Sequence, residues 1–236
     1  MISFFDYKIC TDLPEVLPHK QLIINTINPH SFCIAEKDEN FKEALRKSDI
    51  LIPDGEGIVW GIEKLSGKKT RKIAGYDLHK HCLELLKKNG YGKVFYLGAA
   101  QNTLEKIQER LAEEYPMIEM EGYSPPYKPS FSQTENEEMI QRINAFQPDV
   151  LFVGMTAPKQ EKWNEQHKNQ IDAKIICAIG AVFDFYSGTI KRPSNFWINL
   201  KLEWFIRFLA EPKRLFERNF VSTPKYIFYI LKSNRA

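Results

Sequence analysis

The sequence predicts an α/β fold, in which helices flank both faces of a parallel sheet and a basic helical appendage follows. Short apolar runs typical of buried strands alternate with longer amphipathic segments through most of the 236 residues. Such alternation is typical of parallel sheets, because consecutive parallel strands need a crossover, usually a helix. Positive charge gathers near the C-terminus. We therefore expect a core domain over residues 1–195 and an appendage over residues 196–236.

The predicted strands are short apolar runs that end at loop-forming residues. A strand near residues 3–9 is ambiguous, because a proline-containing loop follows it. The other predicted strands are Gln21–Thr26, Asp49–Ile52, Lys93–Leu97, Met117–Gly122, Asp149–Val153 and Ala173–Ile179. Helical periodicity predicts helices over Ser31–Lys47, Ile58–Leu65, Asp77–Lys88, Asn102–Glu114 and Glu135–Phe146, and one beginning near Pro158.

Asp54 follows directly after one of these strands. Pro53 cannot donate to a sheet ladder, so the strand should stop there. Ligands of open α/β sheets bind beyond the carboxyl ends of the strands, and Gly55 and Gly57 permit close backbone approaches. Asp54 is thus a candidate working carboxylate. The Pro-Asp-Gly segment is also ordinary turn chemistry, in which the aspartate bonds its own backbone.

Thr26, Asn28 and His30 lie at the end of the preceding predicted strand. At the carboxyl edge of the sheet these polar groups would line the same crevice as Asp54. Asn28 followed by Pro29 also fits the start of a helix, with Asn28 as its cap. The two roles are compatible.

Further segments offer groups for binding an anion. The cationic run Lys68–Lys72 before Gly75 is either a solvated loop or a clamp for a diphosphate. Gly98 joins a strand to a helix, a geometry that aims backbone N–H groups at an anion. The full G-x-G-x-x-G fingerprint is missing, which disfavours a dinucleotide site and an NAD-dependent oxidoreductase, whereas a mononucleotide diphosphate stays open.

Pro158 fits the first turn of a helix that would present Lys159 and Gln160 to the crevice. Gln160 is either a site residue or a cap at the helix start. Glu161 fits a first-turn partner of the helix dipole, and Trp163 fits a core aromatic.

The charge of the chain is unevenly divided. Residues 192–236 hold nine Lys and Arg against three Glu, a net charge of +6, so residues 1–191 carry −3 of the total of +3. Aromatic residues interleave with these cations, a pattern that favours binding to an anionic membrane surface. We expect Leu202, Phe205 and Leu209 to bury against the core, and Pro224–Leu231 to face the membrane. The basic residues expected at the membrane or at an acceptor diphosphate are Arg207, Lys213, Arg214 and Arg218.

Composition excludes several classes of protein. No apolar stretch approaches the roughly 18 residues needed to span a bilayer, and no signal-peptide pattern opens the chain. The four cysteines are scattered, as in a cytosolic protein with reduced thiols. No Asp-x-Asp pair or His/Cys cluster offers a metal site, and no nucleic-acid motif accompanies the net acidic core. We expect neither a cofactor nor a nucleic-acid partner.

A series of motifs resembles the WecG/TagA/CpsF glycosyltransferases, in order over about residues 20–220. The motifs are Thr26-x-Asn28, Pro53-Asp54-Gly55-x-Gly57, Gly75-x-Asp77-Leu78, Gly154-x-x-x-Pro158-Lys159-Gln160-Glu161-x-Trp163, Gly180-Ala181-x-Phe183-Asp184 with Gly188, and Glu203-Trp204-x-x-Arg207 with Glu211-Pro212-x-Arg214. The family commonly has Arg-x-x-Gly before its Gly-x-Asp. Here Lys72 stands at the position of that arginine and Arg71 directly precedes it. The sequence therefore offers both residues as the cation that contacts the diphosphate. Arg192-Pro193-Ser194 stands where the family has Arg-Ala-Pro, and Arg192 takes the same expected role.

The resemblance implies a Rossmann-like core, a metal-independent inverting transfer and a basic C-terminal appendage that reaches the membrane. A sugar would pass from a nucleotide-diphosphate donor, most simply of the UDP-ManNAc type, to a polyprenyl-diphosphate-linked sugar in bacterial surface polysaccharide synthesis. By the same resemblance Asp54 falls on the catalytic base, and Thr26, Asn28 and Gln160 fall on active-site positions. The protein would act at the cytoplasmic membrane face. A homo-oligomer is compatible with the sequence.

Two function classes follow from these residues. The first is the membrane-associated glycosyltransferase. The second, suggested by the Lys72 register, is a protein that binds nucleotide sugars on the same fold without turnover. The expected substrate-binding residues are Asn28, Gly55, Gly57, Arg71, Lys72, Gly75, Gly98, Pro158, Lys159, Glu161 and Arg192.

Overall fold

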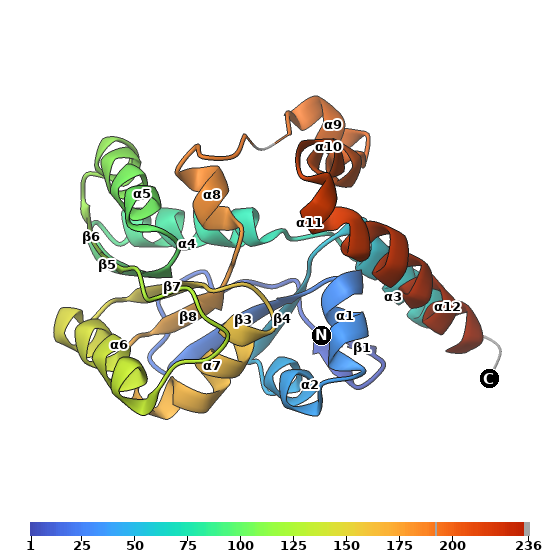
Figure 1. Ribbon diagram of the computed structural model, residues 1–236, viewed down its shortest axis with the longest axis horizontal. Coiled ribbons are helices and arrows are strands. Elements are labelled where there is room, and N and C mark those ends of the chain that lie inside the picture. The colour runs from blue at the N-terminus through green and yellow to red at the C-terminus, as the bar shows by residue number, and fades with distance from the viewer. Residues whose placement is uncertain (192, 234–236) are drawn as a thin grey trace.

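The fold is an eight-stranded sheet with helices on both faces, seen in the computed structural model, which describes residues 1–191 and 193–233 (Figure 1). The strand order is β1-β2-β4-β3-β8-β7-β5-β6. The strands are β1 (Ile2–Phe4), β2 (Tyr7–Ile9), β3 (Leu22–Ile27), β4 (Ile50–Pro53), β5 (Gly92–Gly98), β6 (Ile118–Tyr123), β7 (Val150–Gly154) and β8 (Ile175–Ala178). The predicted α/β class is confirmed.

All strand pairs except β1–β2 are parallel. The ambiguous segment at residues 3–9 is an antiparallel hairpin in which Phe4 pairs with Tyr7, so it begins the sheet at one edge. Thr26 of β3 pairs with Ile52 of β4, and Gly98 of β5 pairs with Gly154 of β7. This register brings the carboxyl ends of the parallel strands to one edge, where ligands of such sheets bind.

The helices of the core form two layers. In Figure 1, α4, α5 and α8 lie on one face of the sheet, and α2, α6 and α7 lie on the other. The core helices are α1 (Pro29–Ala35), α2 (Glu39–Arg46), α3 (Glu56–Ser66), α4 (Gly75–Lys88), α5 (Gln101–Glu114), α6 (Gln133–Phe146), α7 (Lys159–His167) and α8 (Val182–Tyr186), with a short 3₁₀ helix at Lys168–Gln170.

The segment predicted as one helix over residues 31–47 is in fact two helices. Asn28 caps α1, where its Oδ1 accepts from the backbone N–H groups of His30 and Ser31 at 3.0 Å each. Asp38 caps α2, where its Oδ1 accepts from the N–H of Phe41 at 3.0 Å. The prediction was wrong because apolar spacing continues across the break, while the capping side chain gives the second helix its own start.

Gly98 is required where β5 meets β7. Its φ is +122°, and a Cβ there would lie 2.4 Å from the carbonyl oxygen of Gly154. A side chain would therefore push apart the two strand ends that border the crevice.

The C-terminal helices lie at one end of the sheet, where the last of them packs against α1 and α3 (Figure 1). They are α9 (Asn195–Asn199), α10 (Glu203–Ala210), α11 (Pro212–Phe216) and α12 (Thr223–Ser233), with a π-helical stretch at Glu217–Ser222. Among the residues described, no helix is long and apolar enough to cross a bilayer.

We expected α10 to bury its apolar side chains and α12 to face the membrane. This expectation is wrong for Phe205 and Leu209 of α10 and for Tyr226 and Ile230 of α12. Phe205 and Leu209 of α10 are exposed, so the first long helix of this region does not bury them. In α12, by contrast, Tyr226 and Ile230 are fully buried in a cluster with Phe32. Amphipathic spacing marks a face for burial in both helices, but only tertiary contacts decide which helix reaches the core.

We expect Ile230→Ala to lower the free energy of unfolding by about 2–5 kcal/mol, because it leaves a cavity between α12 and α1. Phe228→Ala is the matched control, since that side chain is 65% exposed on the opposite face of the same helix. Urea unfolding of both variants provides the measurement. Equal stability of the two variants would show that α12 does not share the core.

Candidate active site

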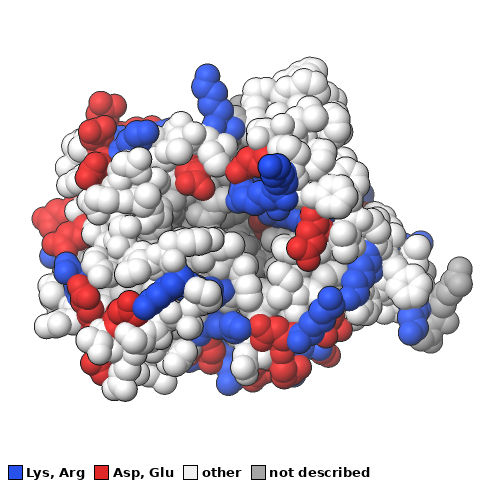
Figure 2. Space-filling view, viewed as in Figure 1, with Lys and Arg blue, Asp and Glu red and all other residues white. Residues whose placement is uncertain are grey.

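Three connected hollows follow the carboxyl edge of the sheet. The central cavity has a volume of about 390 Å³ and lies above the ends of β3, β4 and β8. A β5-side hollow of about 760 Å³ continues past β5 and β7, and a β4-side hollow of about 270 Å³ opens toward α10. Figure 2 shows the molecule hollowed in this region, with Lys and Arg side chains on the rim.

Asp54 lies where the central cavity and the β4-side hollow meet. Its backbone N–H donates to the carbonyl of Ile27 at 2.8 Å, which fixes the turn after β4 against the end of β3. Burial raises the pKa of Asp54, while the nearby guanidinium groups of Arg218 and Arg207 partly offset this effect. A carboxylate with a raised pKa is a stronger base than an ordinary aspartate.

Arg207, Arg214 and Arg218 bring positive charge to the central cavity from the C-terminal helices. The guanidinium of Arg207 lies 4.9 Å from the ring centre of Phe185, and its Nε has no hydrogen-bond partner among the residues described. Burial, and then the charge of Arg218, lower the pKa of Arg207. Arg214 forms an ion pair with Glu211 and borders both the central cavity and the β5-side hollow.

Lys72 and Arg71, the two candidate cations for the diphosphate, have different surroundings. Lys72 lines the β4-side hollow with Asp54 and forms an ion pair with Glu203 of α10 at 3.0 Å. Arg71 is exposed, and its Nη2 donates to the carbonyl of Thr11 at 3.4 Å. The geometry therefore favours Lys72 over Arg71 as the cation beside Asp54.

Thr26 and Asn28 both line the central cavity, as the sequence predicts. The cap and the site role of Asn28 are indeed compatible, because the side chain that caps α1 also borders the cavity. His30 joins them, and its Nδ1 lies 2.8 Å from Ser222 Oγ. That contact connects the cavity wall to the C-terminal segment.

Gln160 and Glu161 are buried at the start of α7 and line the same cavity. Gln160 Nε2 donates to Glu161 Oε1 at 2.9 Å. Burial raises the pKa of Glu161 to about 7. Pro158 immediately precedes α7 and starts the helix that carries this pair.

Lys159 and Gly98 belong to the β5-side hollow. Lys159 Nζ donates to the carbonyl of Lys128 at 2.6 Å, and burial lowers the pKa of this amine. Gly98 starts the turn that leads to the N-terminus of α5. Both residues lie at the end of the crevice away from Asp54. A phosphate group that they contacted would therefore belong to a ligand in the β5-side hollow.

Gly55, Gly57 and Gly75, like Gly98, are required by the backbone and its close contacts. Gly55 has a φ of +101° directly after Asp54, where an L-residue would be strained. A Cβ at Gly57 would lie 2.6 Å from Pro29 Cγ, so α3 could not pack as closely on the start of α1. Gly75 begins α4 at the cavity, and a Cβ there would lie 3.2 Å from Val182 Cγ2.

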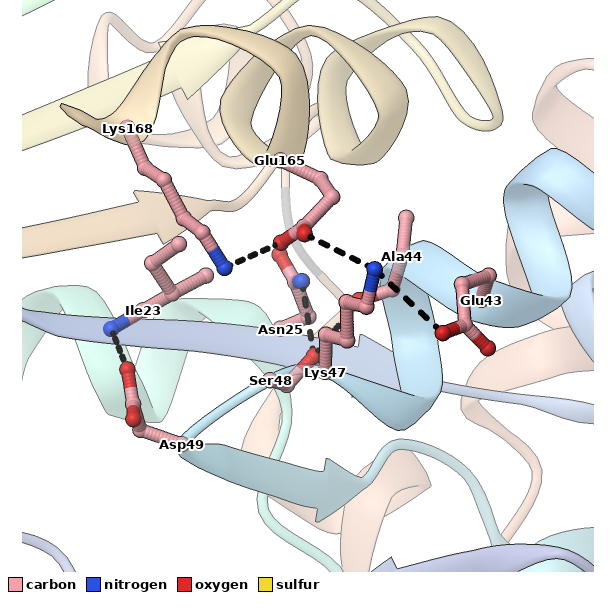
Figure 3. A network of polar contacts seen from close by, with 9 residues as sticks. All are labelled: Ile23, Asn25, Glu43, Ala44, Lys47, Ser48, Asp49, Glu165 and Lys168. Atoms are coloured by element: carbon pink, nitrogen blue, oxygen red, sulfur yellow. Dashed lines mark hydrogen bonds and ion pairs between the residues drawn. The ribbon is translucent and has the colours of Figure 1, made fainter. Parts of the chain in front are cut away.

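A polar network fixes the elements that carry the site (Figure 3). Asp49 Oδ2 accepts from the N–H of Ile23 at 2.8 Å and joins the start of β4 to β3. Glu165 of α7 forms ion pairs with Lys168 at 2.8 Å and with Lys47 after α2 at 3.7 Å. These contacts hold α7 and α2 together on one face of the sheet that carries Thr26 and precedes Asp54.

The remaining predicted residues lie elsewhere. Lys213 is exposed on α11, and Arg192 lies outside the described residues. No group of three or more His, Cys, Asp or Glu side chains that could hold a metal occurs in the part of the chain that the structure describes. Metal independence stays a prediction.

Comparison with known proteins identifies the family. The profile of the glycosyl transferase WecG/TagA/CpsF family matches residues 8–236. The chain belongs to the WecG/TagA/CpsF family. It is therefore a glycosyltransferase, as the motifs predicted, and the NAD-dependent oxidoreductase is rejected.

Three curated relatives in this glycosyltransferase family are each named N-acetylglucosaminyldiphosphoundecaprenol N-acetyl-beta-D-mannosaminyltransferase. One from Bacillus spizizenii is 33% identical over 237 residues, which cover 100% of this chain and 88% of the relative. One from Bacillus subtilis strain 168 is 32% identical, with 90% and 80% covered. One from Staphylococcus aureus strain MRSA252 is 31% identical, with 91% and 81% covered.

Sequence reasoning about this WecG/TagA/CpsF member missed several cavity residues. Glu203 was part of a quoted motif, but its pairing with Lys72 required the fold. The cavity is also lined by Phe185, whose ring lies against the guanidinium of Arg207, and by Tyr127 on the loop after β6. No motif in the sequence marked either residue as functional. Arg207 and Arg218 line both the central cavity and the β4-side hollow beside Asp54, and their expected role at an acceptor diphosphate stays a prediction.

We expect Asp54→Asn to raise the melting temperature at pH 7.5. The folded-state pKa of Asp54 lies above its ordinary value of 3.8, so ionisation destabilises the fold as pH rises through that interval. The gain should therefore shrink as pH falls toward 4. Thermal unfolding at several pH values provides the measurement, with Asp12→Asn at an exposed site as control. A lower melting temperature at pH 7.5 would show that the loss of charge partners for Arg207 and Arg218 dominates.

Proposed function

We propose that this enzyme is an inverting, metal-independent transferase that moves N-acetylmannosamine from a UDP donor to a polyprenyl-diphosphate-linked N-acetylglucosamine. The observation that carries the proposal is the position of Asp54 at the junction of two hollows. A base that serves an inverting transfer has to reach the acceptor on one side and the reacting sugar on the other. The names of the relatives supply the two sugars.

The β5-side hollow suits the nucleotide. It is the largest of the three at about 760 Å³, and Phe183, Tyr123 and Pro125 give it an apolar wall for a base. Arg214 borders this hollow and the central cavity, so a diphosphate that bridges the two would pass beside its guanidinium. Charge develops on that diphosphate as the bond to the sugar breaks, and preplaced cations stabilise it. Lys159 is a second cation on the nucleotide side.

The β4-side hollow suits the acceptor. It joins Asp54 to Lys72, Lys201 and Trp204, which combines cations for a diphosphate with an aromatic face toward α10. In the transfer, the acceptor hydroxyl oxygen attacks the anomeric carbon and Asp54 takes the hydroxyl proton. The bond from that carbon to the nucleotide diphosphate breaks, and the nucleotide leaves with the electron pair. Attack from the face opposite the leaving group inverts the anomeric centre.

Residues 196–236 form a membrane-associating appendage in this proposal, and the enzyme is peripheral on the cytoplasmic face of the membrane. Large apolar side chains of α9 and α10 are exposed, and Figure 2 shows this region as a broad surface with few charges. These are Phe196, Trp197, Leu200, Trp204, Phe205 and Leu209. Contiguous exposed apolar surface of this kind is rare in proteins that stay in water. Trp204 belongs both to this surface and to the β4-side hollow, which gives a lipid-linked acceptor a short path to Asp54.

We expect Asp54→Asn to lower kcat for sugar transfer by about 10²- to 10⁴-fold, the usual contribution of a general base. Binding of UDP should change by less than about twofold, because the nucleotide contacts other residues. The assay measures UDP release from UDP-N-acetylmannosamine with a polyprenyl-diphosphate N-acetylglucosamine acceptor, and Asp12→Asn is the matched control. Full activity of Asp54→Asn would remove this residue as the base. Absence of transfer by the unaltered enzyme would refute the proposed substrates.

We expect the triple variant Phe196→Ser/Leu200→Ser/Leu209→Ser to bind anionic phosphatidylglycerol vesicles at least about tenfold more weakly, because each apolar side chain loses burial in the interface. Co-sedimentation measures the binding. Tyr91→Ser removes an exposed aromatic far from this surface and should bind as the unaltered protein does. Unchanged sedimentation of the triple variant would contradict the assigned membrane surface.

A further inference from the structure

Two neighbouring side chains of the central cavity form a pair in which one oxygen of each has no hydrogen-bond partner among the described residues. Gln160 and Glu161 are 4% and 2% exposed at the start of α7. Gln160 Nε2 donates to Glu161 Oε1 at 2.9 Å. Gln160 Oε1 and Glu161 Oε2 are buried without a hydrogen-bond partner among the described residues. A buried polar atom left unpaired costs about 1–3 kcal/mol, so a bound ligand that pairs with these two oxygens would recover that cost.

The carboxyl of Glu161 decides which way the Gln160 amide faces. An amide nitrogen can only donate, and Glu161 Oε1 accepts whether the carboxyl is ionised or neutral. The nitrogen therefore faces Glu161, and the amide oxygen is turned away from it, on the side of Gly180. A Cβ on Gly180 would lie 3.4 Å from Gln160 Oε1, and Gly180 itself lines the cavity. Without Glu161, the two ends of the amide could exchange.

The orientation of this amide limits what can bind to it. Gln160 Oε1 accepts hydrogen bonds and cannot donate, so a phosphate oxygen that carries no proton is an unsuitable partner. A sugar hydroxyl or an acetamido N–H is suitable. Because burial raises the pKa of Glu161 to about 7, its Oε2 is a donor in one protonation state and an acceptor in the other. A hydroxyl can satisfy both states.

We infer that Glu161 is a positioning residue, which fixes the Gln160 amide so that its oxygen binds a hydroxyl or acetamido N–H of the donor sugar. The inference rests on the proposed function, since it assigns the sugar part of that donor to this wall of the cavity. Cations lie at the other walls, with Arg214 toward the β5-side hollow and Lys72 toward the β4-side hollow. The pair thus distinguishes the sugar from the diphosphates on either side.

The test compares Glu161→Met, which removes the acceptor for Gln160 Nε2, with Glu165→Met. Both remove one carboxylate from α7, but Glu165 lies one turn further on and pairs with Lys168 and Lys47 (Figure 3). Calorimetric titration measures the binding of UDP-N-acetylmannosamine and of UDP. Glu161→Met should weaken binding of the nucleotide sugar at least about tenfold and binding of UDP by less than about twofold, because only the sugar contacts the pair. Glu165→Met should change neither.

A second variant tests whether the loss of nucleotide-sugar binding comes only from a general disturbance of the structure. Glu161→Asp keeps the carboxyl but withdraws it by one methylene from Gln160 Nε2, and it should show the same selective loss for the nucleotide sugar. Melting temperatures establish that the variants are folded. Equal weakening of UDP and nucleotide sugar, or unchanged binding of both by Glu161→Met and Glu161→Asp, would overturn the inference.

The outcome is separable from that of the proposed function. Transfer by the unaltered enzyme tests the reaction, whereas the ratio of nucleotide-sugar binding to UDP binding tests Glu161. An unaltered enzyme that binds UDP-N-acetylmannosamine without transferring the sugar would refute the function alone. If it binds this nucleotide sugar no more tightly than UDP, the assignment of the sugar to this pair is overturned.

Discussion

The site depends on one carboxylate that is half-buried at the end of β4 and faces guanidinium groups from another part of the chain. Burial raises the pKa of Asp54, and the charges of Arg218 and Arg207 oppose that effect, which favours the ionised form that a base needs. Burial in turn lowers the pKa of Arg207, and the charge of Asp54 opposes that effect. The sheet edge and the C-terminal helices therefore stabilise each other's charges across the cavity, and neither half of the site is complete alone.

This arrangement joins catalysis to the location of the substrate. The helices that bring the arginines also carry the exposed apolar surface, and the Lys72–Glu203 ion pair links them to the core beside Asp54. In α12 the same region is anchored by Tyr226 and Ile230. The C-terminal helices, which by sequence resemble a separate membrane anchor, therefore have three roles. Tyr226 and Ile230 pack in the core, Arg207 and Arg218 line the cavity, and the apolar side chains of α9 and α10 are exposed.

Much of the architecture could be predicted from local patterns. Alternation of apolar runs with amphipathic segments predicted the parallel sheet, and Pro53 with the following glycines predicted a turn that presents Asp54. The helix caps were not all recognised in the sequence. Asp38 caps a second helix and so divides a segment that apolar periodicity alone predicted as one helix. The placement of residues 203–231 could not be predicted, because aromatic and basic residues at helical spacing suit a core, a cavity or a membrane equally well.

By itself, the sequence determined the fold class, the family and the strand-end residues that meet at one edge, since these follow from periodicity, turn chemistry and ordered motifs. Only the tertiary structure decided which cation stands beside Asp54, which C-terminal helix enters the core and how Glu161 orients Gln160. The physical reason is distance along the chain. Lys72 and Glu203, or Asp54 and Arg218, become neighbours through packing of the sheet and helices, and no local pattern specifies such pairs.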